Sequence, residues 1–495
     1  MIRRACVWAV ALAVLSTPVL AQARTGVPQV SGPIRVTASS HPFGGAAQQL
    51  RPENLAAQGF VEEEYFVSGK ANVYDWEPAG AVIRTADAPY TTRVLVRRPA
   101  TAARFSGRVI VEMMNPTNIL DLNIGWAIHR DEIMRRGDAW VGLTAKPIAV
   151  LTLKTFDPAR YSALNWSNPR LPTDPLNCPA TGQQTQNTEN GLVWDMNTQV
   201  GAWIRSNGPN NPFTYGGRIT RAKYLYGWGY SQTGGFLYTY VNAIHPLVVK
   251  SDGKSMFDGY LIATAGGPSA INQCAPAIAA GDPRRKVRDV GVPVMHVMTQ
   301  SDYAGFAPNR REDGNTPADR YRDYDLSGAG HATPDELYYG PSPADITKGG
   351  QTPPPVDCNE GPRSRFPSRV PFNAILENLE EWAEHGTTPP PGAVIEMNGT
   401  TGALDQYGNV KGGVRTPYLD VPTSVWAGNS TGPSFCRIAG HETPFTPERL
   451  KALYPTHDAY VRAVEASVRR LVTQRYVTRA DGDAIIAEAR AAKVP

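Results

Sequence analysis

Short apolar runs along the chain predict buried strands, and longer segments with apolar residues at helical spacing predict helices between them. The strand-like runs, rich in β-branched and aromatic residues, are residues 33–38, 91–98, 108–114, 140–144, 224–228, 257–263 and 292–300. Helical spacing is clearest over 195–206 and 371–385, and Gly386 ends the second segment. Strands and helices are therefore interleaved, and the length suits one large domain with insertions.

Two regions depart from this pattern. Residues 147–190 are long, polar and proline-rich, and we expect them to form a loop-rich cap insertion over a site. Residues 387–495 begin at a proline-rich joint and continue with predicted strands and turns over 393–426, followed by helices from 446 onward, over 458–474 and over 481–492. We interpret 387–495 as a C-terminal β/helical extension packed on the core of a single domain, 24–495.

The strongest chemical signal is KYLYGWGYSQTGGFLYTY at residues 223–240. An apolar strand runs into a tight turn centred on Ser231 and then into a segment that can be helical, which is the layout of a nucleophile elbow. Strand and helix nearly touch in such an elbow, so small residues are needed two positions either side of the serine. Gly229 meets that need, and Thr233 replaces the usual second glycine.

An acid and a histidine follow in the order that suits this elbow. Asp302 comes just after the strand at 292–300, and His331 lies 29 residues further on in the glycine-rich turn SGAGH. A histidine can take the serine proton near neutral pH, and a carboxylate can orient its imidazole and stabilise the imidazolium. Asp323 and Asp325 lie nearer to His331 in sequence and remain competitors for the role of the acid.

Several long motifs resemble the bacterial family known only as the alpha/beta hydrolase domain family. They are GRVIVEMMNP (107–116), GDAWVGLTAKP (137–147), GWGYSQTGG (227–235), SGAGH (327–331), LEEWAEHGTTPP (379–390), YGNVKGGVRTPYLDVP (407–422) and LKALYPTHDAYV (450–461). The resemblance implies an α/β-hydrolase fold, with a mostly parallel central sheet and helices on both faces. It also implies a Ser231, His331 and Asp302 triad, but little about the substrate. Lys146 stands where the family pattern leads us to expect glutamine.

The fold also predicts where an oxyanion would be held. One donor is the backbone N–H of the residue after the serine, Gln232, and the other comes from the loop after the strand at 108–114. Pro116 has no N–H, which leaves Asn115 or Thr117. An equal alternative is that Asn115 only shapes the turn.

Two aromatic side chains, Tyr230 and Trp166, are candidates to line an acyl or aryl pocket, although such residues more often pack in cores.

The first residues and the cysteines predict a periplasmic or secreted protein. Residues 1–23 have two arginines, an apolar run and an Ala-Gln-Ala end, as in a signal peptide. Its removal would lower the formal net charge from +4 to +2, which implies no nucleic-acid partner, and would leave no membrane span. Four cysteines would remain, which predicts two disulfides of open connectivity or, alternatively, four free thiols: Cys178, Cys274, Cys358 and Cys436.

These patterns predict a serine hydrolase that cleaves a carboxylic ester through an acyl-enzyme, with a small-molecule ester or acyl substrate. An amide, a thioester or an extracellular polyester would suit the same triad. A third alternative, from a different class, is a non-catalytic binding protein on a hydrolase scaffold. We expect neither a cofactor nor a metal, because backbone donors hold the oxyanion. The sequence leaves the oligomeric state open.

Overall fold

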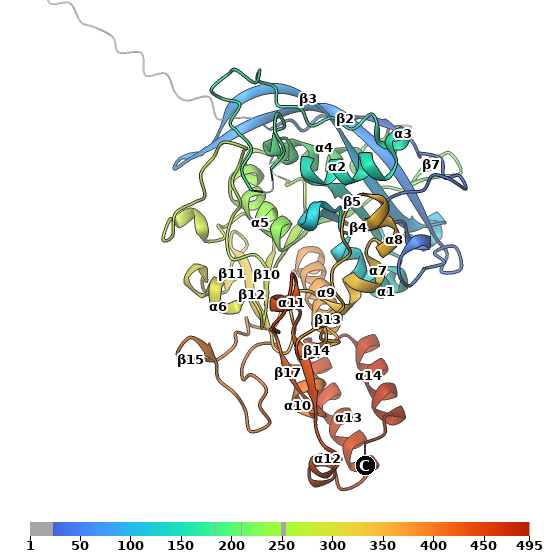
Figure 1. Ribbon diagram of the computed structural model, residues 1–495, viewed down its shortest axis with the longest axis vertical. Helices are drawn as coiled ribbons and strands as arrows, with labels where there is room; N and C mark the ends of the chain where they lie inside the picture. The colour runs from blue at the N-terminus through green and yellow to red at the C-terminus, as the bar shows by residue number, and fades with distance from the viewer. Residues whose placement is uncertain (1–22, 183, 209, 249–253, 495) are drawn as a thin grey trace, which may run out of the picture.

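The computed structural model describes residues 23–494 except 183, 209 and 249–253. The predicted signal peptide, 1–23, therefore lies outside the described residues apart from Ala23. Figure 1 shows a large twisted sheet with helices on its two sides. The three C-terminal helices lie at the end of the molecule opposite the hairpin of β2 (Phe60–Glu77) and β3 (Gly80–Pro99).

The central sheet has ten strands. The six neighbouring strands from β5 (Ala139–Thr144) to β12 (Arg320–Leu326) are parallel. The strands at both ends, β1 to β3 and β11, pair antiparallel. The predicted mostly parallel sheet is thus confirmed. In spatial order the strands are β1 (Gln29–Ser31), β2 (Phe60–Glu77), β3 (Gly80–Pro99), β5 (Ala139–Thr144), β4 (Arg108–Met114), β8 (Tyr224–Tyr230), β9 (Gly259–Ala263), β10 (Val294–Thr299), β12 (Arg320–Leu326) and β11 (Gly314–Asn315).

Each face of the sheet carries its own hydrophobic core, because side chains alternate along a strand. In β4, Val109 and Val111 enter one core, whereas Ile110 and Met114 enter the other. The first core is completed by helices α4 (Val193–Arg205) and α5 (Gln232–Thr239). The second is completed by α1 (Ile124–Arg136) and α9 (Arg369–His385). This places helices on both faces of the sheet, as predicted.

Residues 147–190 begin with two helices, rather than with the loop that their composition predicts.

The other helices and short hairpins pack around the central sheet. The remaining elements are α2 (Pro147–Phe156), α3 (Pro158–Tyr161), β6 (Thr214–Tyr215), β7 (Arg218–Ile219), α6 (Tyr303–Phe306), α7 (Pro334–Tyr339), α8 (Pro343–Lys348), β13 (Asp357–Cys358), β14 (Gly361–Pro362), β15 (Met397–Asn398), β16 (Thr401–Gly402), α10 (Pro417–Asp420), β17 (Ser424–Ala427), α11 (Cys436–Ala439), β18 (His441–Pro444), α12 (Pro447–Leu453), α13 (His457–Thr473) and α14 (Arg479–Ala491). Helices α13 and α14 share a third hydrophobic core with Val370 of α9, which ties the C-terminal helices to the body of the molecule.

Two strand predictions near the N-terminus need correction. The expected strand at 33–38 is irregular chain, and the real edge strand is β1, a few residues earlier. The long strand β2 was missed, because it opens with consecutive glutamates that do not look like a buried strand. Those charges are neutralised across the hairpin by arginines of β3, as when Arg93 Nε donates to Glu64 Oε1 at 2.5 Å with both side chains fully buried.

Candidate active site

Ser231 lies at a sharp turn between β8 and α5 and has a strained backbone, with φ 56° and ψ −116°. A non-glycine residue at positive φ is costly, and such strain is typical of functional turns. The turn also explains Gly229, because a Cβ there would lie only 2.3 Å from the carbonyl oxygen of Thr233. The local sequence therefore forms the strand, tight turn and helix that the motif predicts.

Thr233, which replaces the usual glycine, stabilises the turn through hydrogen bonds of its side chain. Its Oγ1 donates to the carbonyl oxygen of Tyr230 at 3.1 Å and lies 3.3 Å from the Tyr230 backbone N–H, which donates to it. The close approach that a glycine usually permits occurs one residue later. A Cβ on Gly234 would lie 2.3 Å from the carbonyl oxygen of Ala263 in β9. The helix can thus pack tightly on the sheet despite the threonine.

His331 and Asp302 come together just beyond the carboxyl end of the sheet. His331 Nδ1 lies 2.9 Å from Asp302 Oδ1 and 3.0 Å from Oδ2. The loop that carries His331 is held by two further bonds: Ser301 Oγ accepts from its backbone N–H at 3.0 Å, and the Tyr230 hydroxyl donates to its carbonyl oxygen at 2.6 Å. A bond from Nδ1 to the carboxylate leaves Nε2 of the imidazole for a reacting group.

The two competing acids are engaged elsewhere. Asp325 accepts from Arg310 Nη2 at 2.7 and 2.6 Å and from the backbone N–H of Ile395 at 2.8 Å. Asp323 lies 3.4 Å from Nδ1 of a different histidine, the buried His296. Both acids face neighbouring strands and loops, so the geometry favours Asp302 as the partner of His331.

The carboxylate changes the acidity of the histidine. Burial acts to lower the pKa of His331, but the negative charge of Asp302 and its hydrogen bond act in the opposite direction. Glu336 adds a smaller effect of the same sign as Asp302. The pKa of His331 therefore lies above its usual value.

The loop after β4 lies directly beside the serine turn. Asn115 Nδ2 donates to the carbonyl oxygen of Tyr230 at 2.7 Å, and Asn115 also exchanges two backbone bonds with Leu122. The Thr117 N–H donates to Asn115 Oδ1 at 2.8 Å. Both N–H groups proposed from sequence as the second oxyanion donor therefore have partners within the loop. The side chain of Asn115 braces the loop against the elbow.

Lys146, where the family pattern leads us to expect glutamine, lies two residues after β5 and directly before α2. Its ammonium group is 3.3 Å from Gln232 Oε1, beside the elbow, and its side chain is nearly buried. Burial lowers the pKa of Lys146 to about 8. The substituted position thus contacts the residue whose backbone N–H is the first predicted oxyanion donor.

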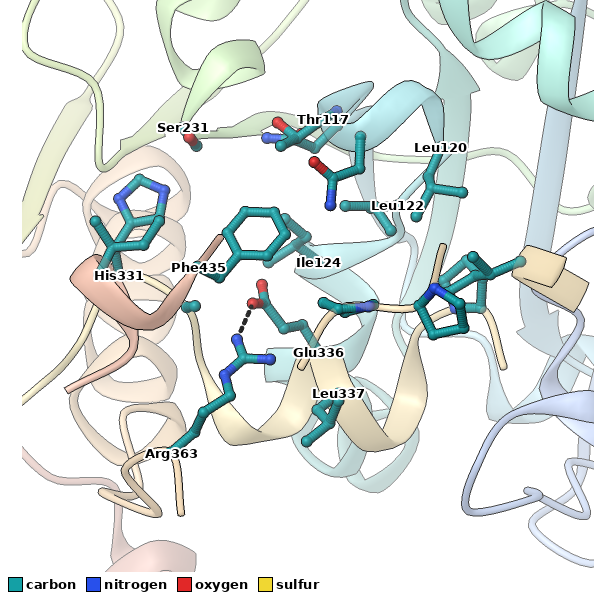
Figure 2. A pocket seen from close by; sticks show the side chains of 18 of the residues that line it. Thr117, Leu120, Leu122, Ile124, Ser231, His331, Glu336, Leu337, Arg363 and Phe435 are labelled. Carbon is teal, nitrogen blue, oxygen red and sulfur yellow. Dashed lines mark hydrogen bonds and ion pairs between the residues drawn. The ribbon is translucent and has the colours of Figure 1, made fainter. Parts of the chain in front are cut away.

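A cavity of about 180 Å³ opens beside Ser231 and His331. Figure 2 shows both side chains on one side of it, with Thr117, Leu120, Leu122 and Ile124 on another. Tyr230, one of the two candidate pocket residues, is among the residues that line this cavity. Trp166 is not: it is 3% exposed and packs in the first hydrophobic core.

The outer wall of the cavity comes from segments that follow His331, and none of the described residues of 147–190 lines it. Helix α7 contributes Glu336 and Leu337, the loop before β13 contributes Val356, and the start of α11 contributes Phe435. These positions were not identified from sequence. Near Glu336 the sequence shows only a helix cap, in which Thr333 Oγ1 accepts from the Glu336 N–H at 3.2 Å. A helix cap does not predict that a residue lines a pocket.

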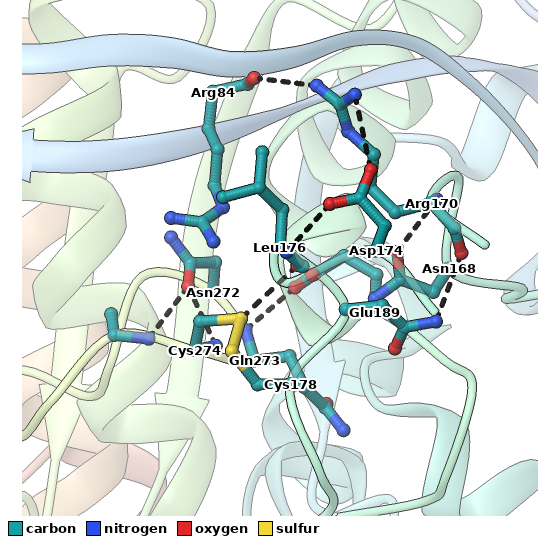
Figure 3. The surroundings of a disulfide bond; sticks show 12 residues. Arg84, Asn168, Arg170, Asp174, Leu176, Cys178, Glu189, Asn272, Gln273 and Cys274 are labelled. Atoms are coloured by element: carbon teal, nitrogen blue, oxygen red, sulfur yellow. Dashed lines mark hydrogen bonds and ion pairs between the residues drawn. A yellow bond between two sulfur atoms is a disulfide. The ribbon is translucent and has the colours of Figure 1, made fainter. Parts of the chain in front are cut away.

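The four cysteines form two disulfides, Cys178–Cys274 and Cys358–Cys436, with Cα–Cα distances of 5.4 and 5.5 Å. The alternative of four free thiols is therefore wrong. Figure 3 shows the first bridge, which fastens the loop around Leu176 to the segment after β9. Beside it, Glu189 Oε1 accepts from the backbone N–H of Gln273 at 2.8 Å. The region 147–190 is thus anchored to the body of the protein at this point.

In the part of the chain that the structure describes, no group of three or more His, Cys, Asp or Glu side chains could hold a metal ion. Within the same residues, no helix is both long and apolar enough to cross a membrane.

Comparisons with known proteins place the chain in a family but not with a close relative. No curated protein sequence matches it. Distantly similar solved structures include esterase Est22 (9% identity, 61% of this chain and 80% of that chain, TM-score 0.32). A glucuronoyl esterase from Solibacter usitatus (7%, 51% and 68%, TM-score 0.26) and an alpha-beta serine hydrolase homologue from Coxiella burnetii (10%, 53% and 88%, TM-score 0.25) are others. Likenesses this distant say nothing about the reaction. Residues 30–487, however, match the model of one family, and the chain therefore belongs to the alpha/beta hydrolase domain family and has its fold.

Proposed function

We propose that this protein is a serine hydrolase that cleaves carboxylic esters through an acyl-enzyme, with Ser231 as nucleophile, His331 as general base and Asp302 as the acid that orients it. The observation that carries the proposal is the combination of a strained serine and a carboxylate-bound histidine on the wall of one cavity. Family membership supports a hydrolase but does not specify the bond that is cleaved.

The chemistry follows from the geometry. His331 takes the Ser231 proton as Oγ attacks the ester carbonyl carbon, and the resulting oxyanion is held by backbone donors that include the Gln232 N–H. The protonated imidazole, stabilised by Asp302, then gives its proton to the leaving alcohol as the carbon–oxygen bond breaks. Water attacks the acyl-enzyme by the same route and releases the acid. Asn115 fixes the loop after β4 against the elbow. Because the N–H groups of Asn115 and Thr117 are bonded within that loop, neither is proposed as the second oxyanion donor.

Two further features belong to the proposal. The two disulfides support an oxidising, periplasmic or secreted location. Phe435 and Ile438, which lie in the C-terminal extension 387–495, line the cavity, and this supports a single domain over an independent C-terminal module.

A fluorophosphonate probe tests the proposal directly. We expect it to label the wild-type protein, to fail with Ser231→Ala, and to label the control Ser162→Ala, which changes an exposed serine. On p-nitrophenyl acetate, Ser231→Ala should lose roughly 10⁴-fold to 10⁶-fold in kcat. Labelling without ester turnover would point to the amide, thioester or polyester alternatives. Absence of labelling in the wild-type protein would favour a binding protein instead.

A further inference from the structure

Besides Ser231 and His331, polar residues line the cavity at two places: Asn115, Thr117 and Asn118 on the loop after β4, and the pair of Glu336 and Arg363. Glu336 and Arg363 both line it, while the other walls are mainly leucine, isoleucine, proline and phenylalanine side chains. In the view of Figure 2, the Glu336 carboxylate points into the cavity from α7, and the Phe435 ring lies between it and Ser231. The cavity thus offers a substrate an apolar path from the reacting serine to an ion pair.

The two members of the pair are not equivalent. Arg363 Nη2 lies 3.5 Å from Glu336 Oε1, which is long for a charge-assisted hydrogen bond. The Arg363 side chain is 6% exposed, whereas that of Glu336 is 21% exposed, so the carboxylate faces the cavity and the guanidinium lies behind it. In the described part of the chain, Arg363 is the one side chain that bonds this carboxylate, which can accept several more hydrogen bonds.

A carboxylate at an apolar wall costs free energy unless it is satisfied, and isolated polar groups in apolar pockets commonly orient a ligand. We propose that Glu336 is a specificity-determining residue, which hydrogen-bonds a hydroxyl group on the chain of the ester substrate, away from the scissile bond. The proposal rests on the proposed hydrolase function of Ser231. It goes further by assigning a substrate class: esters with an apolar chain that carries a distal hydroxyl.

The charges favour a neutral hydroxyl over an ionic group. Arg363 already neutralises the charge of Glu336, so a substrate cation would add an uncompensated positive charge to a confined site. A substrate anion would be repelled by the Glu336 carboxylate, which is the more exposed member of the pair. Burial raises the pKa of Glu336 to about 7, although Arg363 and His331 oppose it. A hydroxyl can both donate and accept, so it can pair with either protonation state.

The test compares p-nitrophenyl esters of straight-chain acids from C4 to C10 with the same esters carrying a terminal hydroxyl. The measured quantity is the ratio of kcat/KM for the hydroxylated ester to that for its plain partner. At the chain length that spans the cavity, we expect the wild-type ratio to reach about tenfold, the effect of one hydrogen bond to a charged group. Glu336→Leu should bring the ratio to one or below.

Glu336→Leu leaves Arg363 without its partner, so a double variant, Glu336→Leu with Arg363→Met, keeps the wall neutral and apolar. It should also lose the preference while it still cleaves the plain esters. Glu448→Gln, which removes an exposed carboxylate on α12, is the matched control and should keep the wild-type ratio.

A purely structural role for Glu336 would lower kcat/KM for both esters equally and leave their ratio unchanged, and that result would overturn the inference. A wild-type ratio near one at every chain length would also overturn it, whether or not the variants fold. If the wild-type protein cleaves neither series, the proposed function fails, and this inference fails with it.

Discussion

The disulfide Cys358–Cys436 connects two pieces of the cavity wall, and this leads to a prediction that separates stability from activity. Cys358 lies two residues after Val356, and Cys436 directly follows Phe435; both Val356 and Phe435 line the cavity. The bridge Cys178–Cys274 adjoins no lining residue of that cavity. We therefore compare two double variants, in which each pair of cysteines is replaced by alanine.

The two bridges should matter almost equally for stability. They close loops of 96 and 78 residues, for which the chain-entropy model gives about 4.7 and about 4.5 kcal/mol respectively at 25 °C. Losses measured for native disulfides are often smaller, between about 2 and about 5 kcal/mol. The free energies of unfolding of the two variants, measured in urea, should thus fall by similar amounts.

Their activities should differ. At a temperature where both variants remain folded, Cys178→Ala with Cys274→Ala should keep the wild-type kcat/KM on a p-nitrophenyl ester. Cys358→Ala with Cys436→Ala should lower it by between about threefold and about a hundredfold, because a loosened wall misplaces the substrate. Backbone bonds from Arg363 to Val356 at 3.1 Å and from Ala332 to Ile438 at 2.9 Å remain, so activity should weaken rather than disappear.

Two results would refute this reasoning. The first is an equal effect of the two double variants on kcat/KM, which would mean that the wall does not depend on its bridge. The second is four titratable thiols in the denatured, unreduced protein, which would mean that the two disulfides do not form.

Other predictions concern the elbow and its partners. Asp302→Asn should lower kcat by roughly 10⁴-fold. Asp325→Asn, which weakens the contacts of Asp325 with Arg310 and the Ile395 N–H, should mainly lower the melting temperature. The reverse order would transfer the role to Asp325. Because the base must be neutral and its pKa is raised, the acidic limb of kcat/KM should have its midpoint above the usual histidine value of about 6.5, and activity should be lost as pH falls through it. A midpoint below that value would contradict the Asp302 contact. Gly234→Ala should lower the free energy of unfolding by about 1 to 3 kcal/mol or more, because its Cβ would clash with the Ala263 carbonyl oxygen. The control Gly305→Ala, which has open space around it, should lower it less. Equal losses in thermal unfolding experiments would count against the close approach of Gly234 to β9.

Much of the fold could be predicted because its signals are local. The strands β4, β5, β8, β9 and β10 are short apolar runs, and each appears within a few residues of its predicted position. The elbow around Ser231 is also a local feature, since the strand, the turn and the helix are adjacent in sequence. Strand β2 escaped prediction because its glutamates are acceptable only when the arginines of β3 lie opposite them.

By itself, the sequence determined most of the core strands and the serine turn, because each of these features depends on residues within a few positions of one another. The order of serine, acid and histidine along the chain can also be read directly from the sequence. Only the tertiary structure decided that Asp302, rather than Asp325, reaches His331, and which cysteines pair. It also placed Glu336 on the cavity wall and Trp166 in the core. These outcomes depend on how segments far apart in the sequence pack together, from 29 residues for Asp302 and His331 to 96 for Cys178 and Cys274. No short-range pattern of apolar and polar residues carries that information.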